Sequence, residues 1–298
     1  MTDSLNDLDV KAAAREPLTA DDAARLLACP DLVRIGVLGE AARRARWDGQ
    51  VTYGRVRLVE GAKAPAERGD AGEVRIIGTP ASFDDAIAWT HIAVSLANGA
   101  VVTGFSLGDL LMLAGGDHLA LAAIAQALRA SGLHAVAEVP LDRVGDTENA
   151  IEVVRAVVHG GLGAWRATVE RAEAGDRLAL IQRAVDLQRE TGALRAFAPL
   201  PRVDAVETPS TGYDDVRTIA LARLMVVEVP SIQVDWPLYG PKLAQVALTY
   251  GADDVDGVPV DDELQLGHRR SPREDIERQI RAAGATPVER DGRYQPLG

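Results

Sequence analysis

Short apolar runs alternate with amphipathic segments along most of this chain, and this repetition restricts the fold more than any other feature. Each run is rich in aliphatic and β-branched residues, and the next begins roughly 25 to 35 residues later, after a segment with helical periodicity. The pattern predicts strands at residues 51–60, 74–78, 100–105, 134–139, 164–169, 194–198 and 231–234. The helices predicted between them are residues 82–97, 117–130, 147–158, 176–191, 213–224 and 240–250. Such repeated units build a parallel sheet covered by helices.

The spacing fits an α/β fold of the TIM type, a (β/α) barrel that is partial or complete. Seven predicted strands are one short of a closed barrel, so an open or incomplete barrel fits better. Helices are predicted before the barrel, where Thr19 provides an N-cap, and after it, where Pro272 opens a helix. We therefore expect an N-terminal helical lead-in at residues 1–48, the barrel at 49–257, and a C-terminal helical extension at 258–298 packed on the outside.

Composition and charge exclude several classes of partner. The chain has 298 residues, 47% of them hydrophobic, and it contains no apolar run long enough to span a membrane. Its net charge of -12 argues against binding to nucleic acid or to an anionic membrane, since both require a positive surface. An acidic, polar N-terminus does not look like a signal peptide, so we expect a cytoplasmic protein.

Four sequence blocks, in a fixed order, carry a family resemblance. They are ALRASGL at 127–133, LIQRAVDLQRETGALRAFAPLP at 180–201, the segment 219–257 that includes GPKLAQVALTYGADDVDG, and PVERDGRY at 287–294. Together they resemble the radical S-adenosylmethionine enzymes of futalosine-type menaquinone biosynthesis, the aminodeoxyfutalosine synthases and dehypoxanthine futalosine cyclases. The resemblance covers most of residues 120–298 and implies a barrel of the radical S-adenosylmethionine type.

The first half of the chain departs from that family at its defining motif. The family carries a CxxxCxxC loop after its first strand, whereas residues 57–72 read RLVEGAKAPAERGDAG, and Cys29 is the one cysteine in the sequence. An iron–sulfur cluster that cleaves S-adenosylmethionine is held by three thiolates. We therefore predict no iron–sulfur cluster, no other cofactor and no radical chemistry, and we leave S-adenosylmethionine binding open.

Four charged residues lie on or directly after predicted strands, and these are the candidate catalytic residues. A charge on a strand that is buried on both faces is costly unless it is paired, so it usually lines a pocket or joins an internal ion pair. We expect Arg166 and Glu170 to pair. The full set is Glu138, Arg166, Glu170 and Asp235.

Substrate contacts are predicted from two further groups. Trp236 and Tyr239 follow a strand at the end of a barrel where ligands bind, and their rings suit a nucleoside or aryl group, although core packing explains them equally well. Asp253 and Asp254 face the barrel mouth or cap a turn. The stretch ADDVDGVPVDDE at 252–263 has carboxylates at calcium-loop spacing, but Ala252 occupies the first ligand position, so we interpret it as a solvated acidic loop with no metal.

These observations lead to two functional hypotheses. The first is a cluster-less homologue of aminodeoxyfutalosine synthase that binds a small nucleoside-like ligand or serves as a partner subunit in futalosine-pathway menaquinone biosynthesis. Its partner would be a radical S-adenosylmethionine paralogue or a second copy of itself. The alternative is an enzyme that uses the pocket at the barrel mouth for acid/base chemistry, without a cluster, on a nucleoside-like or aryl carboxylate substrate.

Overall fold

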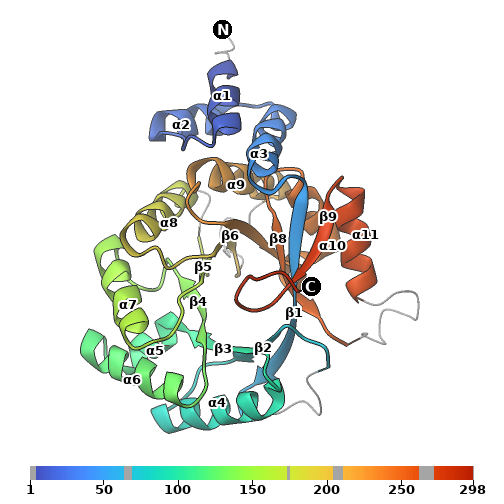
Figure 1. Ribbon diagram of the computed structural model, residues 1–298. Coiled ribbons are helices and arrows are strands. Elements are labelled where there is room, and N and C mark those ends of the chain that lie inside the picture. Colours follow the sequence, from blue (N-terminus) through green and yellow to red (C-terminus); the bar gives the residue numbers. More distant parts are fainter. Residues whose placement is uncertain (1–4, 64–68, 173–174, 204–210, 262–271, 298) are drawn as a thin grey trace.

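The computed structural model describes residues 5–63, 69–172, 175–203, 211–261 and 272–297 (Figure 1). The strands are β1 (Gln50–Glu60), β2 (Glu73–Ile77), β3 (Val101–Ser106), β4 (Ala135–Pro140), β5 (Arg166–Val169), β6 (Ala196–Pro201), β7 (Ser231–Asp235), β8 (Asp254–Pro259) and β9 (Thr286–Arg290). The helices are α1 (Asn6–Ala14), α2 (Ala20–Ala28), α3 (Leu32–Trp47), α4 (Phe83–Ala97), α5 (Leu107–Leu113), α6 (His118–Ala130), α7 (Thr147–His159), α8 (Arg177–Thr191), α9 (Gly212–Met225), α10 (Trp236–Leu248) and α11 (Pro272–Ala282).

The sheet is a closed barrel of eight parallel strands. Strands β2 to β8 follow one another in chain order, and β1 pairs with both β8 and β2, which closes the ring. The predicted α/β barrel of the TIM type is therefore confirmed in its complete form, and the preference for an open or incomplete barrel is wrong. The eighth strand, β8, lies within the stretch interpreted as a solvated acidic loop, whose last residues fall outside the described part of the chain.

A ninth strand extends the sheet at the end of the chain. Residues 50–54 of β1 pair with β9, and residues 56–60 of β1 pair with β2. Strand β8 pairs with residues 52–56 of β1 and so occupies the opposite edge. Strand β9 is therefore in line with β2, at the end of the barrel where the strands begin. The C-terminal tail was predicted to pack along the outside, whereas it supplies this strand and crosses the barrel end (Figure 1).

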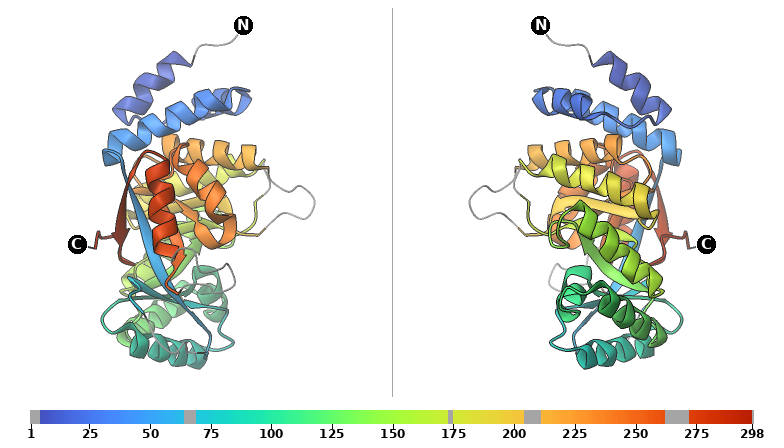
Figure 2. Two further views of the ribbon diagram at one scale, coloured as in Figure 1. Left: turned by 90° about the vertical axis from the view of Figure 1, so that its right-hand side faces the viewer. Right: turned by 90° about the vertical axis from the view of Figure 1, so that its left-hand side faces the viewer.

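Helices form an outer layer around the barrel, and three N-terminal helices pack on one side of it (Figure 2). Helices α2 and α3 lie in the predicted helical lead-in, whereas α1 and α5 were not predicted as separate helices. Thr19 caps α2 as expected, because its Oγ1 accepts a hydrogen bond from Asp22 N at 3.2 Å, and the Asp22 carboxylate accepts one from Thr19 N. Helix α3 packs closely at Gly39, where an added Cβ would lie 2.2 Å from the carbonyl oxygen of Tyr250.

Within the described residues, no single helix is long and apolar enough to cross a membrane. The bent pair α5 and α6 passes that test together, by length and composition only. Both helices pack against neighbouring strands and helices. Their residues Leu107, Leu110, Leu121 and Leu128 are all fully buried.

Candidate functional site

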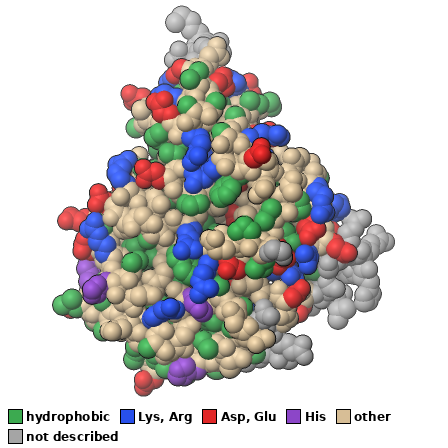
Figure 3. Space-filling model, in the orientation of Figure 1, with side chains coloured by type: hydrophobic (Ala, Val, Ile, Leu, Met, Phe, Trp, Pro, Cys, Tyr) green, Lys and Arg blue, Asp and Glu red, His purple; other side chains and the backbone are tan. Residues whose placement is uncertain are grey.

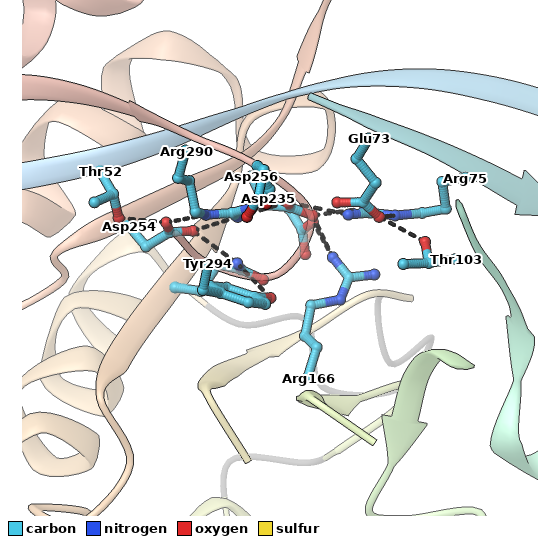
Figure 4. Close-up of polar contacts among 12 residues, drawn as sticks. Thr52, Glu73, Arg75, Thr103, Arg166, Asp235, Asp254, Asp256, Arg290 and Tyr294 are labelled. Carbon is cyan, nitrogen blue, oxygen red and sulfur yellow. Dashed lines mark hydrogen bonds and ion pairs between the residues drawn. The ribbon is translucent and has the colours of Figure 1, made fainter. Parts of the chain in front are cut away.

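The axis of the barrel is occupied by a chain of ion pairs rather than by apolar side chains. Asp256 on β8 is its centre, since its carboxylate accepts hydrogen bonds from three arginines on three other strands (Figure 4). Arg75 of β2 donates at 2.7 and 3.1 Å, Arg290 of β9 donates at 2.9 Å, and Arg166 of β5 makes a short contact. The Asp256 side chain is 0% exposed. Alternation along β8 explains this placement, because Asp254 and Asp256 both point into the barrel.

Below this centre, towards the start of the strands, the last residues of the chain fill the barrel. Arg290 donates to both carboxylate oxygens of Asp254, at 2.6 and 2.8 Å. The ring of Tyr294 lies 4.1 Å from the Arg290 guanidinium, and its hydroxyl is 3.2 Å from Nε2 of Gln233. Thr52 completes this layer by donating to Asp254 at 2.5 Å. The lower end of the barrel is therefore closed by side chains that hydrogen-bond to one another, while Oε1 of Gln233 has no partner among the described residues.

Above the centre, at the ends of the strands, the network reaches solvent. Arg202, just after β6, contacts Asp235 at 2.9 Å and Glu138 at 3.4 Å. The side chains of Arg202 and Glu138 are 24% and 19% exposed, whereas that of Arg166 is 3% exposed. Arg166 lies 3.5 Å from Asp235 and 3.8 Å from Glu138, and so connects this layer to Asp256. Glu138 and Arg202 are thus the charged groups of the network that a ligand at the mouth can touch.

The network is charged in its folded state. Burial opposes ionisation of Asp256, but the three arginines outweigh burial and hold its pKa well below the usual range. Burial likewise acts to lower the pKa of Arg75 and Arg290, and their carboxylate partners raise it above the ordinary value. Arg202 behaves in the same way through Asp235 and Glu138. A buried ion network of this kind is costly to break, because each removed partner leaves an uncompensated charge.

The predicted pair of Arg166 and Glu170 does not form. Glu170 follows β5, where its carboxylate accepts a hydrogen bond from Arg143 at 2.9 Å, and Arg143 also contacts Asp109 at 3.1 Å. Arg166 points to the barrel axis instead. Three of the four candidate catalytic residues, Glu138, Arg166 and Asp235, are therefore brought together, and Glu170 belongs to a separate surface pair.

The four predicted substrate residues are divided between the two ends of the barrel. Trp236 and Tyr239 begin α10 beyond the end of β7, where both are partly buried and the Tyr239 hydroxyl donates to the carbonyl of Pro201. Asp253 and Asp254 lie at the start of β8, at the opposite end. Asp254 belongs to the axis network. Asp253 faces the outer helices and lies 2.7 Å from Arg223, and burial raises its pKa to about 6.

Sequence reasoning missed several members of the network, although two signals were available. Arg75 and Glu73 interrupt an otherwise apolar strand, which is the same pattern that singled out Arg166. Arg290 and Tyr294 lie in PVERDGRY, a block noted only for its family resemblance. Thr103 was missed as well; its hydroxyl donates a hydrogen bond to Glu73 at 2.6 Å.

This chain does not supply the cysteine thiolates that a radical S-adenosylmethionine cluster needs. The loop from β1 to β2, residues 61–72, contains no cysteine. Cys29 lies at the C-cap of α2, among the N-terminal helices outside the barrel, where its Sγ is 3.8 Å from the carbonyl oxygen of Asp31. Among the residues that the structure describes, no three His, Cys, Asp or Glu side chains are grouped to hold a metal ion.

Comparison with known proteins agrees with the fold and with the family resemblance. Residues 196–298 match the family described as the CofH/MqnC C-terminal region. The aminodeoxyfutalosine synthase of Streptomyces coelicolor is 36% identical over 135 residues, covering 38% of this chain and 34% of that protein. The 5-amino-6-(D-ribitylamino)uracil–L-tyrosine 4-hydroxyphenyl transferase of Archaeoglobus fulgidus is 29% identical over 160 residues, covering 49% of this chain and 44% of that protein.

Among solved structures, methylornithine synthase (PylB) has a TM-score of 0.67 at 14% identity, covering 94% of this chain and 97% of that one, which supports the barrel fold. The matched stretches span only about a third to under half of the curated relatives' length. Over residues 196–298 the chain matches the CofH/MqnC C-terminal region, and it resembles the radical S-adenosylmethionine enzymes of menaquinone biosynthesis.

Proposed function

We propose that this chain is a cluster-less relative of the aminodeoxyfutalosine synthases that performs no radical chemistry and acts as a ligand-binding or partner subunit linked to futalosine-pathway menaquinone biosynthesis. The observation that carries the proposal is the placement of its cysteine. The loop after β1 offers no thiolate, and Cys29 lies outside the barrel on α2. A cysteine-held cluster needs several thiolates at one place.

The axis network is buried in its lower part and partly exposed at the barrel mouth, and this difference supports ligand binding at the mouth. The axis below is filled by ion pairs whose members are almost fully buried, so a ligand inside the barrel would have to bind above them. There, Glu138 and Arg202 present opposite charges to solvent. Leu58 and Ile77 lie near the ends of β1 and β2, on the inward side by strand alternation, and are 47% and 36% exposed. An apolar side facing a few charged groups suits a nucleoside-like ligand.

A thermal-shift screen tests this binding role. The ligands are S-adenosylmethionine, aminodeoxyfutalosine and adenosine, each added to the wild type, to Arg202→Met and to Arg155→Met. Arg155 is the matched control, because it is an exposed arginine that pairs with Glu152 and Glu190 on the outer surface. We expect at least one ligand to raise the melting temperature of the wild type and of Arg155→Met, and to have no effect on Arg202→Met.

The partner arm uses the same full chain. If no ligand shifts the melting temperature, the mouth is not a nucleoside site, and the partner role alone remains. Size-exclusion chromatography with and without a radical S-adenosylmethionine paralogue from the same genome then decides it. Co-elution supports the partner role, and separate elution together with no ligand shift overturns the whole proposal.

Acid/base catalysis at the mouth has narrower support. Glu138 and Asp235 both contact Arg202, which places two carboxylates beside one cation. Asp235 is only 5% exposed at its side chain, and Glu170 lies apart from Arg202, so Glu138 is the carboxylate beside Arg202 that is open to a substrate proton. Turnover that survives Glu138→Gln would remove this alternative.

A further inference from the structure

A cleft lies where the N-terminal helices meet the barrel, on the outer side of α9. It encloses about 260 Å³, a volume that includes space open to solvent, and lies between α1, α3 and α9. Its lining is Ala12, Arg15, Glu16, Ala42, Arg46, Arg223, Leu224 and Val227. Figure 3 shows Lys and Arg side chains at the level of this junction. Three arginines and one glutamate therefore share the walls of one small cleft.

Arg15 and Arg46 lack matching carboxylates among the described residues. Arg223 is the exception, since it lies 2.7 Å from Asp253 and also donates to the carbonyl of Gly251. Arg46 donates to the carbonyl of Val227 at 2.6 Å, a neutral acceptor. No ion pair of Arg15 is found in the described part of the chain. Glu16 is the only carboxylate in the lining, so the cleft keeps an excess of positive charge.

Arg43, one turn before Arg46 on α3, adds to this charge from behind. Its side chain is 0% exposed, and none of its three guanidinium nitrogens has a hydrogen-bond partner in the structure. The carboxylate nearest to it, that of Glu40, is 3.8 Å away and lies closer to Arg44, at 2.7 Å. Leaving a buried charged donor unpaired is expensive, and arginine does not escape the cost by losing its proton.

Burial also lowers the pKa values of several arginines at this cleft. Burial, together with repulsion from Arg223 and Arg15, lowers the pKa of Arg46 to about 10. Burial also lowers the pKa of Arg43 and of Arg223. Most other buried arginines of the protein have carboxylate partners that raise their pKa, as Arg75 does. A nearby negative charge would relieve the cluster.

We propose that this cleft binds a small oxyanion of the phosphate or sulfate class, held by Arg15, Arg46 and Arg223. Guanidinium groups match the oxygen geometry of such anions and bind them through paired N–H donors. Arg15 follows α1, Arg46 belongs to α3 and Arg223 belongs to α9, so the anion joins the N-terminal helices to the barrel. The site is separate from the barrel mouth and independent of its ligand.

Titration of the full chain with inorganic phosphate tests the proposal. Phosphate or sulfate at millimolar concentration is compared with chloride at equal ionic strength and pH, because high concentrations of phosphate and sulfate stabilise many proteins without binding. At about 100 times the dissociation constant, we expect the melting temperature to rise by roughly 5 °C. Isothermal titration calorimetry should give one site per chain.

Variants decide whether the effect belongs to this cleft. We expect Arg15→Gln and Arg46→Gln each to weaken phosphate binding at least tenfold. Arg15 is exposed, so its replacement leaves the fold intact. Arg44→Gln is the matched control on the same helix, since Arg44 pairs with Glu40 outside the cleft, and it should bind like the wild type. A wild type that responds equally to phosphate and chloride, or an Arg15→Gln variant that binds phosphate normally, overturns the proposal.

Discussion

Asp256 on β8 and Arg290 on β9 form an ion pair with 2.9 Å between Oδ1 and Nη2, although their two strands pair with opposite edges of β1. The contact therefore crosses the barrel interior and ties the last strand of the chain to the axis network. Because Asp256 also pairs with Arg75 and Arg166, it is the shared counter-charge of three arginines that lie far apart in the sequence. The stability of the barrel should depend on this one carboxylate more than on any surface ion pair.

Replacing Asp256 by Ala should destabilise the protein by about 3 to 5 kcal/mol, because it leaves buried guanidinium groups without their counter-charge. Chemical denaturation at pH 7 measures the loss. Asp261→Ala is the control, since Asp261 pairs with Arg57 at the surface with a side chain that is 69% exposed. That pair should be worth less than about 1 kcal/mol. Equal losses for the two variants would contradict the central role of Asp256.

Gly54 should tolerate no side chain, since an added Cβ would lie 2.6 Å from Nη1 of Arg290. That guanidinium cannot move aside without leaving Asp254 and Asp256, so we expect Gly54→Ala to cost about 1 to 3 kcal/mol. Gly212→Ala is the matched control, because nothing lies within 4 Å of its added Cβ. Denaturant midpoints distinguish the two variants. An unchanged midpoint for Gly54→Ala would show that the Arg290 side chain rearranges at little energetic cost.

The N-terminal helices should contribute stability that disappears in acid. Burial opposes ionisation of Asp22, but hydrogen bonds from Lys11 and Thr19 outweigh it and lower its pKa from 3.8 to about 2. Because the folded pKa is below the unfolded one, this stabilisation is complete above about pH 4 and is lost as the pH falls toward 2. It should amount to about 1 to 2 kcal/mol.

Comparing Asp22→Asn with Asp21→Asn isolates this effect. Asp21 is exposed in the same turn, so it is the matched control, and its replacement should cost less than that of Asp22 at pH 7. Asp22→Asn should cost more at pH 7 than at pH 3, as measured by urea unfolding at each pH. A pH-independent cost at Asp22 would mean that its carboxylate gains nothing from Lys11 and Thr19.

Arg43→Met should stabilise the protein in phosphate-free buffer by about 1 to 4 kcal/mol. Methionine fills a similar volume and removes a buried charge that has no hydrogen-bond partner. Arg223→Met should instead destabilise, because it leaves Asp253 buried without its cation. Thermal unfolding of both variants checks the prediction. A lower melting temperature for Arg43→Met would indicate that Arg43 is satisfied by water.

The repeating units were predictable from sequence because apolar strands alternate with amphipathic helices, and seven strands lie close to their predicted positions. Strand β8 was missed for a physical reason. Its inward residues, Asp254 and Asp256, are charged because they form ion pairs in the axis network. The sequence of the segment is therefore typical of an acidic loop. Strand β9 was missed because its partner, β1, is more than 200 residues away, and local sequence carries no trace of that pairing.

The charged residues of the site were easier to predict than their partners. Arg166 and Asp235 were found because charges on buried strands need explanation, and both lie in the network. Glu170 was predicted to pair with Arg166, whereas the closest carboxylate to Arg166 comes from Asp256, 90 residues later. Closure of the barrel brings these strands together, and that closure depends on β8, which sequence did not predict.

Anaerobic reconstitution with iron and sulfide, followed by desalting, iron and sulfide analysis and visible spectroscopy, is the most direct test of a cluster-less barrel. The wild type is compared with Cys29→Ser, which removes the one thiol of the sequence. We predict no stoichiometric iron and sulfide and no cluster absorbance, with identical results for the two proteins. A stoichiometric cubane cluster in the wild type would contradict the account.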